Sequence, residues 1–164
     1  PVRARPQVAM ICGTENAPEK RWPVSHWRAL VEQLLAAVPE VEIVLFGTPA
    51  DRVITDQVAD GFPEGVIQNL AGKTDLAAFC DGLKQCNVVV CNDTGGMHLA
   101  NMLGTPVAVV FGPTNPVRTG PIFAAPTHIL QPEGCPVAGG MPIEGVSAER
   151  VFASVLPHVE GAQS

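Results

Sequence analysis

The sequence is poor in charged residues, which make up 16% of its 164 positions, whereas about 25% is usual for a soluble domain. It has no run of about 18 uncharged apolar residues of the kind that spans a membrane. Its first ten residues lack the long apolar core of a signal peptide. We therefore expect a cytoplasmic protein without a transmembrane segment.

Several kinds of site are also missing. The five cysteines are odd in number, scattered and never arranged as C-x-x-C, so neither a disulfide framework nor a zinc site is indicated. The net charge of −6 and the absence of a Lys/Arg block argue against nucleic acid, whose phosphates need a basic surface. The dinucleotide motif G-x-G-x-x-G, the P-loop and an Asp-x-Asp pair are all absent. A standard dinucleotide or P-loop site is therefore unsupported, and no metal is expected.

What the sequence has is a regular alternation of short apolar runs and amphipathic segments. Strands are expected at 7–12, 41–46, 66–70, 88–91, 107–111 and near 128–130, and helices between Ser25 and Pro39, at 50–59, from Thr74 to 85, at 96–103 and at 147–159. Parallel neighbours need a crossover helix, so this order predicts an α/β fold with a mostly parallel sheet. No internal repeat or linker interrupts it, and residues 1–164 are expected to form a single domain.

Open parallel sheets bind ligands at the carboxyl ends of their strands. In this sequence those ends lead into loops that begin at Gly13, Gly47, Ala71, Asn92 and Gly112. The residues with the most chemical potential gather in the same loops, so we expect the functional site at this edge of the sheet.

The segment 92–98 follows a buried strand and opens a helix. Gly95 and Gly96 let a ligand approach the backbone closely, and the free amides at the helix start favour an anion such as pyrophosphate. Asp93 or Thr94 fits an ordinary N-cap equally well, with the glycines merely turning the chain. The triplet D-T-G also occurs in aspartic proteases, but those enzymes are all-β, and here the triplet runs into a helix.

Three further side chains belong to the same strand-end loops or to the helix that follows them. Lys20 can reach a phosphate as a compact point charge, and Asp51 follows the second strand, where an acidic residue commonly accepts the ribose hydroxyls of nucleotides. His98 lies one turn into its helix and can face the same ligand as Gly95. Each also has an ordinary role, respectively a solvated lysine, a carboxylate at a helix start and a histidine bonded to a backbone carbonyl.

Read together, KRWP at 20–23, LAGKTDL at 70–76, NDTGGMHLANMLGTPV at 92–107 and FGPTNP at 111–116 resemble the C-terminal domain of the ADP-heptose:lipopolysaccharide heptosyltransferases. The resemblance implies a Rossmann-like three-layer domain, one half of a GT-B glycosyltransferase. The other half, an N-terminal acceptor domain with an aspartate as the expected catalytic base, is absent from these 164 residues. No catalytic residue is therefore expected in this chain.

The resemblance also implies a donor-binding set. Its members are Lys20, Asp51, Lys73, Thr74, Asp93, Thr94, Gly95, Gly96 and His98. Lys20 would contact the phosphates or the donor sugar, Thr94 and Gly95 the pyrophosphate, and Asp93 and His98 the sugar. Lys73 and Thr74 would border the adenine. Asp51 would bind the ribose, although a glutamate in a longer loop is usual in the family.

The implied function is inverting transfer of heptose from an ADP-sugar to the lipopolysaccharide core, without a cofactor, at the inner face of the inner membrane. The chain alone should bind the donor, ADP-heptose or a similar nucleotide-sugar, but not transfer it, because the acceptor is reached through the missing domain. Two alternatives stay open. Nucleotide-sugar 2-epimerases share the fold but normally carry paired glutamates where this chain has His98, Leu99 and Ala100. A stand-alone nucleotide-binding module without catalysis is the other.

Overall fold

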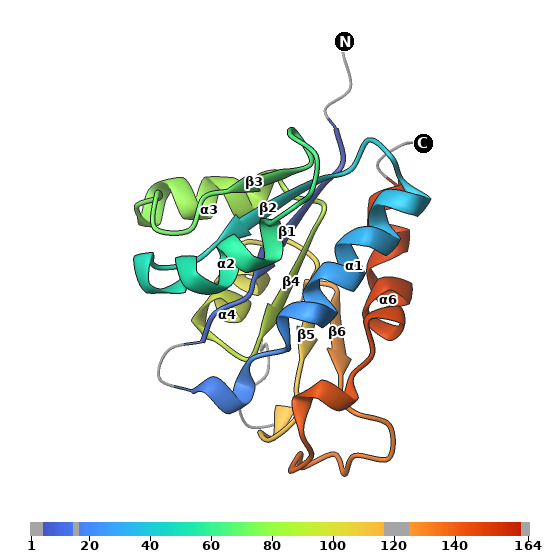
Figure 1. Ribbon diagram of the computed structural model, residues 1–164. Helices are drawn as coiled ribbons and strands as arrows, with labels where there is room; N and C mark the ends of the chain where they lie inside the picture. Colours follow the sequence, from blue (N-terminus) through green and yellow to red (C-terminus); the bar gives the residue numbers. More distant parts are fainter. Residues whose placement is uncertain (1–4, 15–16, 117–124, 162–164) are drawn as a thin grey trace.

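The computed structural model, which describes residues 5–14, 17–116 and 125–161, is built around a six-stranded parallel sheet (Figure 1). Its strands are β1 (Gln7–Ile11), β2 (Glu42–Phe46), β3 (Ile67–Asn69), β4 (Val88–Asn92), β5 (Val107–Val110) and β6 (Thr127–Leu130). They lie in the order β3-β2-β1-β4-β5-β6. This is the strand order of the Rossmann fold, and the order reverses between β1 and β4.

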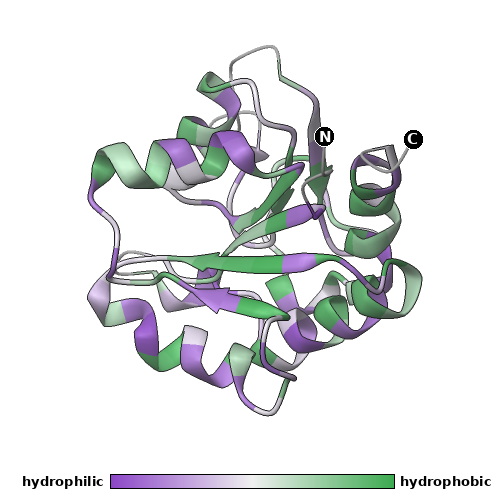
Figure 2. Ribbon diagram, turned by 90° about the horizontal axis from the view of Figure 1, so that it is seen from above, coloured by the Kyte–Doolittle hydropathy of each residue, from purple (hydrophilic) through white to green (hydrophobic). Residues whose placement is uncertain are grey.

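Helices cover both faces of the sheet, as Figure 2 shows from above. They are α1 (Val24–Ala37), α2 (Arg52–Ala59), α3 (Leu76–Gln85), α4 (Gly95–Met102) and α6 (Ala148–Glu160), with short 3₁₀ turns η1 (Pro18–Lys20), η2 (Pro49–Asp51) and η3 (Ile143–Gly145). One hydrophobic cluster joins the sheet to α1, α2 and α6, and a second joins it to α3 and α4. The three-layer α/β prediction is confirmed.

The apolar runs of the sequence are explained by burial on both faces of the sheet. In β1, Val8 and Met10 belong to the cluster under α1, α2 and α6, whereas Ala9 and Ile11 belong to the opposite cluster. Every residue of β4 is buried. Successive side chains point to opposite faces, so a strand covered on both sides must be apolar throughout.

The N-caps predicted for α1 and α3 are wrong, and the starts of α2, α4 and α6 lie within two residues of those predicted. Helix α1 begins at Val24 rather than after Ser25, because the Pro23 carbonyl already accepts hydrogen bonds from the amides of His26 and Trp27. Asp75, not Thr74, caps α3, since its carboxylate accepts a hydrogen bond from the Ala78 amide at 2.8 Å. Ser147, the first residue of the helix predicted at 147–159, is instead the N-cap of α6, where its hydroxyl accepts a hydrogen bond from the Arg150 amide.

The helical spacing of Leu76, Phe79, Cys80 and Leu83 predicts that all four are buried, and this prediction for α3 is partly wrong. Leu83 is buried as expected, but Leu76 is 72% exposed, and Phe79 and Cys80 are only partly buried. The helix starts at the carboxyl edge of the sheet, so its first turn extends beyond the core. Part of the predicted loop at 112–121 lies outside the described residues. Within the described ranges, no helix combines the length and apolar character needed to cross a membrane.

Candidate functional site

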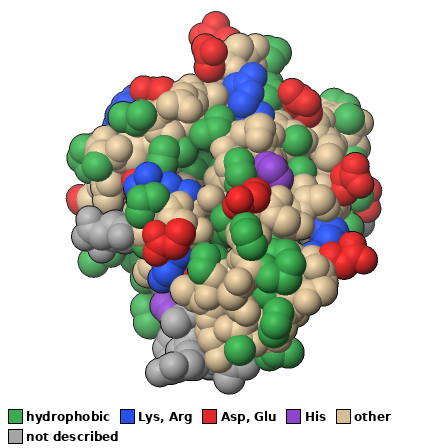
Figure 3. Space-filling view, turned by 60° about the horizontal axis from the view of Figure 1, so that its bottom comes forward, with side chains coloured by type: hydrophobic (Ala, Val, Ile, Leu, Met, Phe, Trp, Pro, Cys, Tyr) green, Lys and Arg blue, Asp and Glu red, His purple; other side chains and the backbone are tan. Residues whose placement is uncertain are grey.

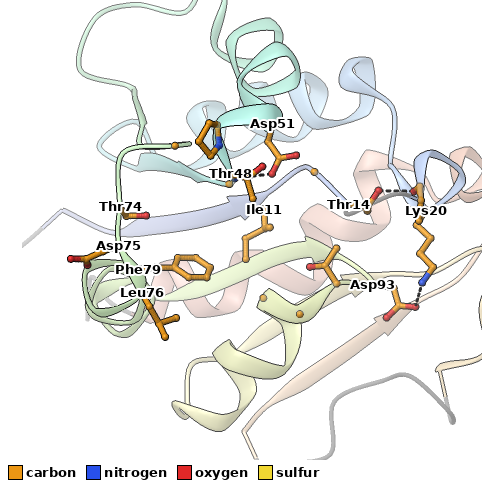
Figure 4. A pocket seen from close by; sticks show the side chains of 18 residues that line it. Ile11, Thr14, Lys20, Thr48, Asp51, Thr74, Asp75, Leu76, Phe79 and Asp93 are labelled. Atoms are coloured by element: carbon orange, nitrogen blue, oxygen red, sulfur yellow. Dashed lines mark hydrogen bonds and ion pairs between the residues drawn. The ribbon is translucent and has the colours of Figure 1, made fainter.

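A cavity of about 670 Å³ lies at the carboxyl ends of β1 to β4, on the face seen in Figure 3 and from close by in Figure 4. It is lined by Ile11, Gly13, Thr14, Ala17, Lys20, Gly47, Thr48, Pro49, Asp51, Gly72, Thr74, Asp75, Leu76, Phe79, Asp93, Thr94, Gly95 and Gly96. Four strand-end loops and the first turns of α3 and α4 thus contribute to one wall. The cavity is at the edge of the sheet where the sequence places the site.

Of the nine residues predicted to bind a donor, seven line this cavity, and Lys73 and His98 do not. Lys73 is exposed between two lining residues, Gly72 and Thr74. His98 is partly buried on α4, beyond the turn whose glycines face the cavity. The structure therefore brings together seven predicted residues that lie between positions 20 and 96, whereas Lys73 lies between two lining residues and His98 lies two residues after the last one.

One end of the cavity is charged. The Lys20 Nζ lies 3.6 Å from Asp93 Oδ2, and the hydroxyl of Thr114 donates a hydrogen bond of 2.7 Å to the same oxygen. The Asp93 side chain is only 6% exposed, whereas that of Lys20 is 27% exposed. The ammonium group therefore remains accessible from the cavity, while the carboxylate is held deeper in the wall.

A buried asparagine fixes the loop that carries Lys20. Asn92, at the end of β4, is fully buried and accepts a 3.0 Å hydrogen bond from the Trp22 amide. Its own amide group donates to the Cys12 carbonyl at 2.8 Å. The Trp22 indole donates to the Val146 carbonyl at 2.8 Å. Asn92 thus bridges the beginning and the end of the β1 loop and sets where Lys20 lies relative to β4.

The start of α4 presents its backbone amides without a side-chain cap. The two glycines there differ in their surroundings. A Cβ on Gly96 would come 2.5 Å from Ile11 Cδ1, so a side chain at that position would have to displace the end of the Ile11 side chain. A Cβ on Gly95 would meet nothing within 4 Å, and this residue faces the cavity. Next to it, the buried Thr94 hydroxyl has no hydrogen-bond partner among the described residues. This turn is suited to receive an anion.

Asp51 lines the cavity and also stabilises its own turn, which is the ordinary role considered for it from the sequence. Its Oδ2 accepts a 2.9 Å hydrogen bond from the Thr48 amide. A side chain on Gly13 would overlap the Asp51 carboxylate, and one on Gly47 would come 2.8 Å from its Oδ2. The two glycines therefore make room for this carboxylate to lie across the ends of β1 and β2.

The other end of the cavity is largely apolar, which sequence reasoning missed. Leu76 and Phe79 lie there, well away from the Lys20–Asp93 pair in Figure 4, with Asp75 beside Phe79 and Ile11 between the two ends. Phe79 packs against Phe46 with ring centroids 5.2 Å apart. Helical spacing had assigned Leu76 and Phe79 to the core. Their position in the first turn after a strand-end loop was the signal that they could instead line the site.

The two buried cysteines at the ends of β1 and β4, Cys12 and Cys91, are not reactive thiols. Burial raises the pKa of the Cys12 thiol, and the nearby Asp51 carboxylate adds to the effect. Burial likewise raises the pKa of Cys91, with a smaller contribution from Asp93. Both side chains therefore stay protonated. Among the described residues, no group of three or more His, Cys, Asp or Glu side chains is placed to hold a metal ion.

Comparison with known proteins gives consistent matches. Residues 2–138 match glycosyltransferase family 9 (heptosyltransferase). The chain is 35% identical over 133 residues to lipooligosaccharide heptosyltransferase 2 of Haemophilus influenzae, an alignment that covers 79% of this chain and 38% of that protein.

Solved structures agree with the sequence matches. E. coli ADP-heptose LPS heptosyltransferase II superposes with a TM-score of 0.85 at 25% identity and covers 98% of this chain and 48% of that one. E. coli heptosyltransferase WaaC with ADP superposes with a TM-score of 0.78 at 26% identity and covers 96% and 46%. The chain spans less than half the length of each of these three proteins.

Proposed function

Because the chain belongs to glycosyltransferase family 9, the heptosyltransferase family, we propose that it forms the half of such an enzyme that binds the nucleotide-sugar donor. The observation that carries this proposal is the two-ended cavity. It joins a charged end to an apolar end, and a nucleoside diphosphate likewise joins an anionic pyrophosphate to a flat base.

The pyrophosphate is proposed to lie between Lys20 and the start of α4. Uncapped amides at a helix start carry partial positive charge and point their hydrogens at the ligand. Lys20 adds a full positive charge at the same end of the cavity. Gly95 leaves the space over these amides open. Together these groups would neutralise much of the charge of an ADP moiety.

The nucleoside is proposed to occupy the rest of the cavity. The apolar surface of Leu76, Phe79 and Ile11 would be covered by a base, which would account for the 72% exposure of Leu76. The backbone beside Thr74 would border the edge of that base. Asp51, whose Oδ2 is fixed by the Thr48 amide, would accept hydrogen bonds from the ribose hydroxyls.

The proposed reaction is displacement at the anomeric carbon of a heptose, with inversion. A base from the acceptor-binding half would take the proton of an acceptor hydroxyl on the lipopolysaccharide core. Lys20 and the α4 amides would stabilise the leaving ADP, and Asp93 would hold the sugar. We expect this chemistry to need neither a metal ion nor a cofactor, and to take place on the cytoplasmic side of the membrane.

The proposal is tested by titrating the 164-residue chain with ADP in a calorimeter and by following its melting temperature. Ligand that binds only the folded state at 100 times its Kd should add about 2.7 kcal/mol of stability. Binding of ADP with a higher melting temperature is the expected result. No heat and no stabilisation at millimolar ADP would contradict the donor site. Binding of UDP but not of ADP would favour the 2-epimerase alternative.

A further inference from the structure

Thr114 lies in the loop after β5, outside the residues that line the cavity, yet it bonds to a residue that does. Its hydroxyl donates to Asp93 Oδ2 at 2.7 Å. That distance is within the short range of hydrogen bonds from a hydroxyl to a carboxylate, which are about twice as strong as neutral ones. The bond spans 21 positions of the sequence and joins the loops that follow β4 and β5.

The contacts that Lys20 and Thr114 make with the Asp93 carboxylate differ in whether a bound donor would disturb them. Lys20 contacts the same oxygen at 3.6 Å, longer than the 2.7–2.9 Å typical of a charge-assisted hydrogen bond. Lys20 also lines the cavity, so an arriving pyrophosphate would attract its ammonium group. Thr114 does not line the cavity and carries no charge, so its hydroxyl can keep holding Asp93 while Lys20 turns to the phosphates.

Thr114 is itself held from behind by the segment 139–143. Gly139 has φ +87 and is so close to the Thr114 carbonyl that any side chain there would overlap it. The Gly140 amide donates a 2.9 Å hydrogen bond to the Gly112 carbonyl, two residues before Thr114. A Cβ on Gly112 would come 2.7 Å from the Ile143 backbone. The loop that contains Thr114 thus packs closely against the loop at 139–143.

From these contacts we propose that Thr114 is a positioning residue that holds the Asp93 carboxylate in place to bind the sugar of the donor. The inference rests on the proposed function, because it takes the ligand to be an ADP-sugar and Asp93 to face its sugar. The inference assigns the affinity for the ADP moiety and the affinity for the sugar to different groups of the protein. The ADP moiety would be bound by Lys20 and the α4 amides, and the sugar would depend on Thr114 through Asp93.

The test compares Thr114→Val, which keeps the shape but removes the hydroxyl, with Thr114→Ser, which keeps the hydroxyl. Calorimetry measures the binding of ADP and of ADP-heptose to each variant and to the unsubstituted chain. Thr114→Val should weaken ADP-heptose about tenfold, in line with the loss of one hydrogen bond to a charged group, and change ADP by less than about twofold. Thr114→Ser should restore ADP-heptose binding to within about twofold.

Each other result overturns the inference in a recognisable way. Equal weakening of both ligands by Thr114→Val would indicate a general structural role, and no weakening would show that Asp93 needs no such support. If the unsubstituted chain binds ADP-heptose no more tightly than ADP, the proposed contact between Asp93 and the sugar is wrong. Binding of neither ligand would overturn the proposed function. If Thr114→Val is unfolded at the assay temperature, Thr114→Ala removes the same hydroxyl and carries the same expectation.

Discussion

Gly95 and Gly96 are adjacent in the first turn of α4, but replacing each by alanine should affect a different property of the protein. The methyl group of Gly96→Ala would lie 2.5 Å from Ile11 Cδ1, inside the packed layer between the helix and the sheet. The methyl group of Gly95→Ala would meet no protein atom within 4 Å and would extend into the space over the helix amides. The first change should reduce stability, and the second should reduce ligand binding.

The magnitudes follow from the packing. Overpacking in a core costs about 1–3 kcal/mol, and the better helix propensity of alanine offsets about 1 kcal/mol, which leaves up to about 2 kcal/mol of lost stability for Gly96→Ala. For a chain of this size that is a fall in Tm of up to about 8 °C. Gly95→Ala should keep or slightly raise the Tm. It should weaken ADP about tenfold or more, which is about 1.4 kcal/mol of binding free energy.

Differential scanning calorimetry of the two variants and the unsubstituted chain gives the stabilities, and isothermal titration with ADP gives the affinities. Each variant is the other's control, because they add the same methyl group at neighbouring positions. The reasoning is refuted if Gly95→Ala is the less stable variant, or if it binds ADP as tightly as the unsubstituted chain. Gly96→Ala, once shown to be folded, should bind ADP nearly normally.

Lys20→Ala should weaken ADP about tenfold but leave adenosine binding nearly unchanged, since the lost contact is to phosphate; calorimetry showing equal weakening would rule out that role. Asn92→Leu should lower the free energy of unfolding in urea by about 2–5 kcal/mol, because it leaves a backbone amide and a backbone carbonyl unpaired in the interior, and a loss under about 1 kcal/mol would contradict this. Burial, and to a smaller extent His128, lowers the pKa of His158 from its ordinary 6.5. The unfolded chain therefore binds more protons than the folded chain as the pH drops below about 6.5, so the Tm should fall with the pH in that range. His158→Gln should flatten this dependence of the Tm on pH, and an unchanged slope would exclude His158 as its source.

The layered fold could be predicted from the sequence because its physical signals are local. A short apolar run ending at glycine, as at Gly13 and Gly47, marks a strand buried on both faces, and the alternation with helices dictates parallel pairing. Seven of the nine predicted site residues line the cavity for the same reason, since the carboxyl ends of parallel strands meet at one edge. Helix starts were less certain, because Thr74 and Asp75 are both good N-caps and only the carboxylate of Asp75 accepts the Ala78 amide.

The rest of the site depends on distances that local patterns do not contain. The spacing of Leu76 and Phe79 is the same whether the side chains fill a core or line a cavity. Gly95 and Gly96 look alike in the sequence, although one faces open space and the other Ile11. The bond between Thr114 and Asp93 joins residues 21 positions apart, and nothing at either position indicates its partner.

The anchoring of Trp22 has a consequence for the entropy of binding. Its amide is bonded to a fully buried side chain, and its indole, 1% exposed, is bonded to the chain just before α6. Breaking these two hydrogen bonds requires opening the core. The hydrogen of the Trp22 amide should therefore exchange with solvent as slowly as those of the central strands. The end of the Lys20 loop is therefore already ordered before any ligand arrives. Since ordering side chains and loops on binding costs affinity, a site preorganised by folding can hold a nucleotide with few contacts.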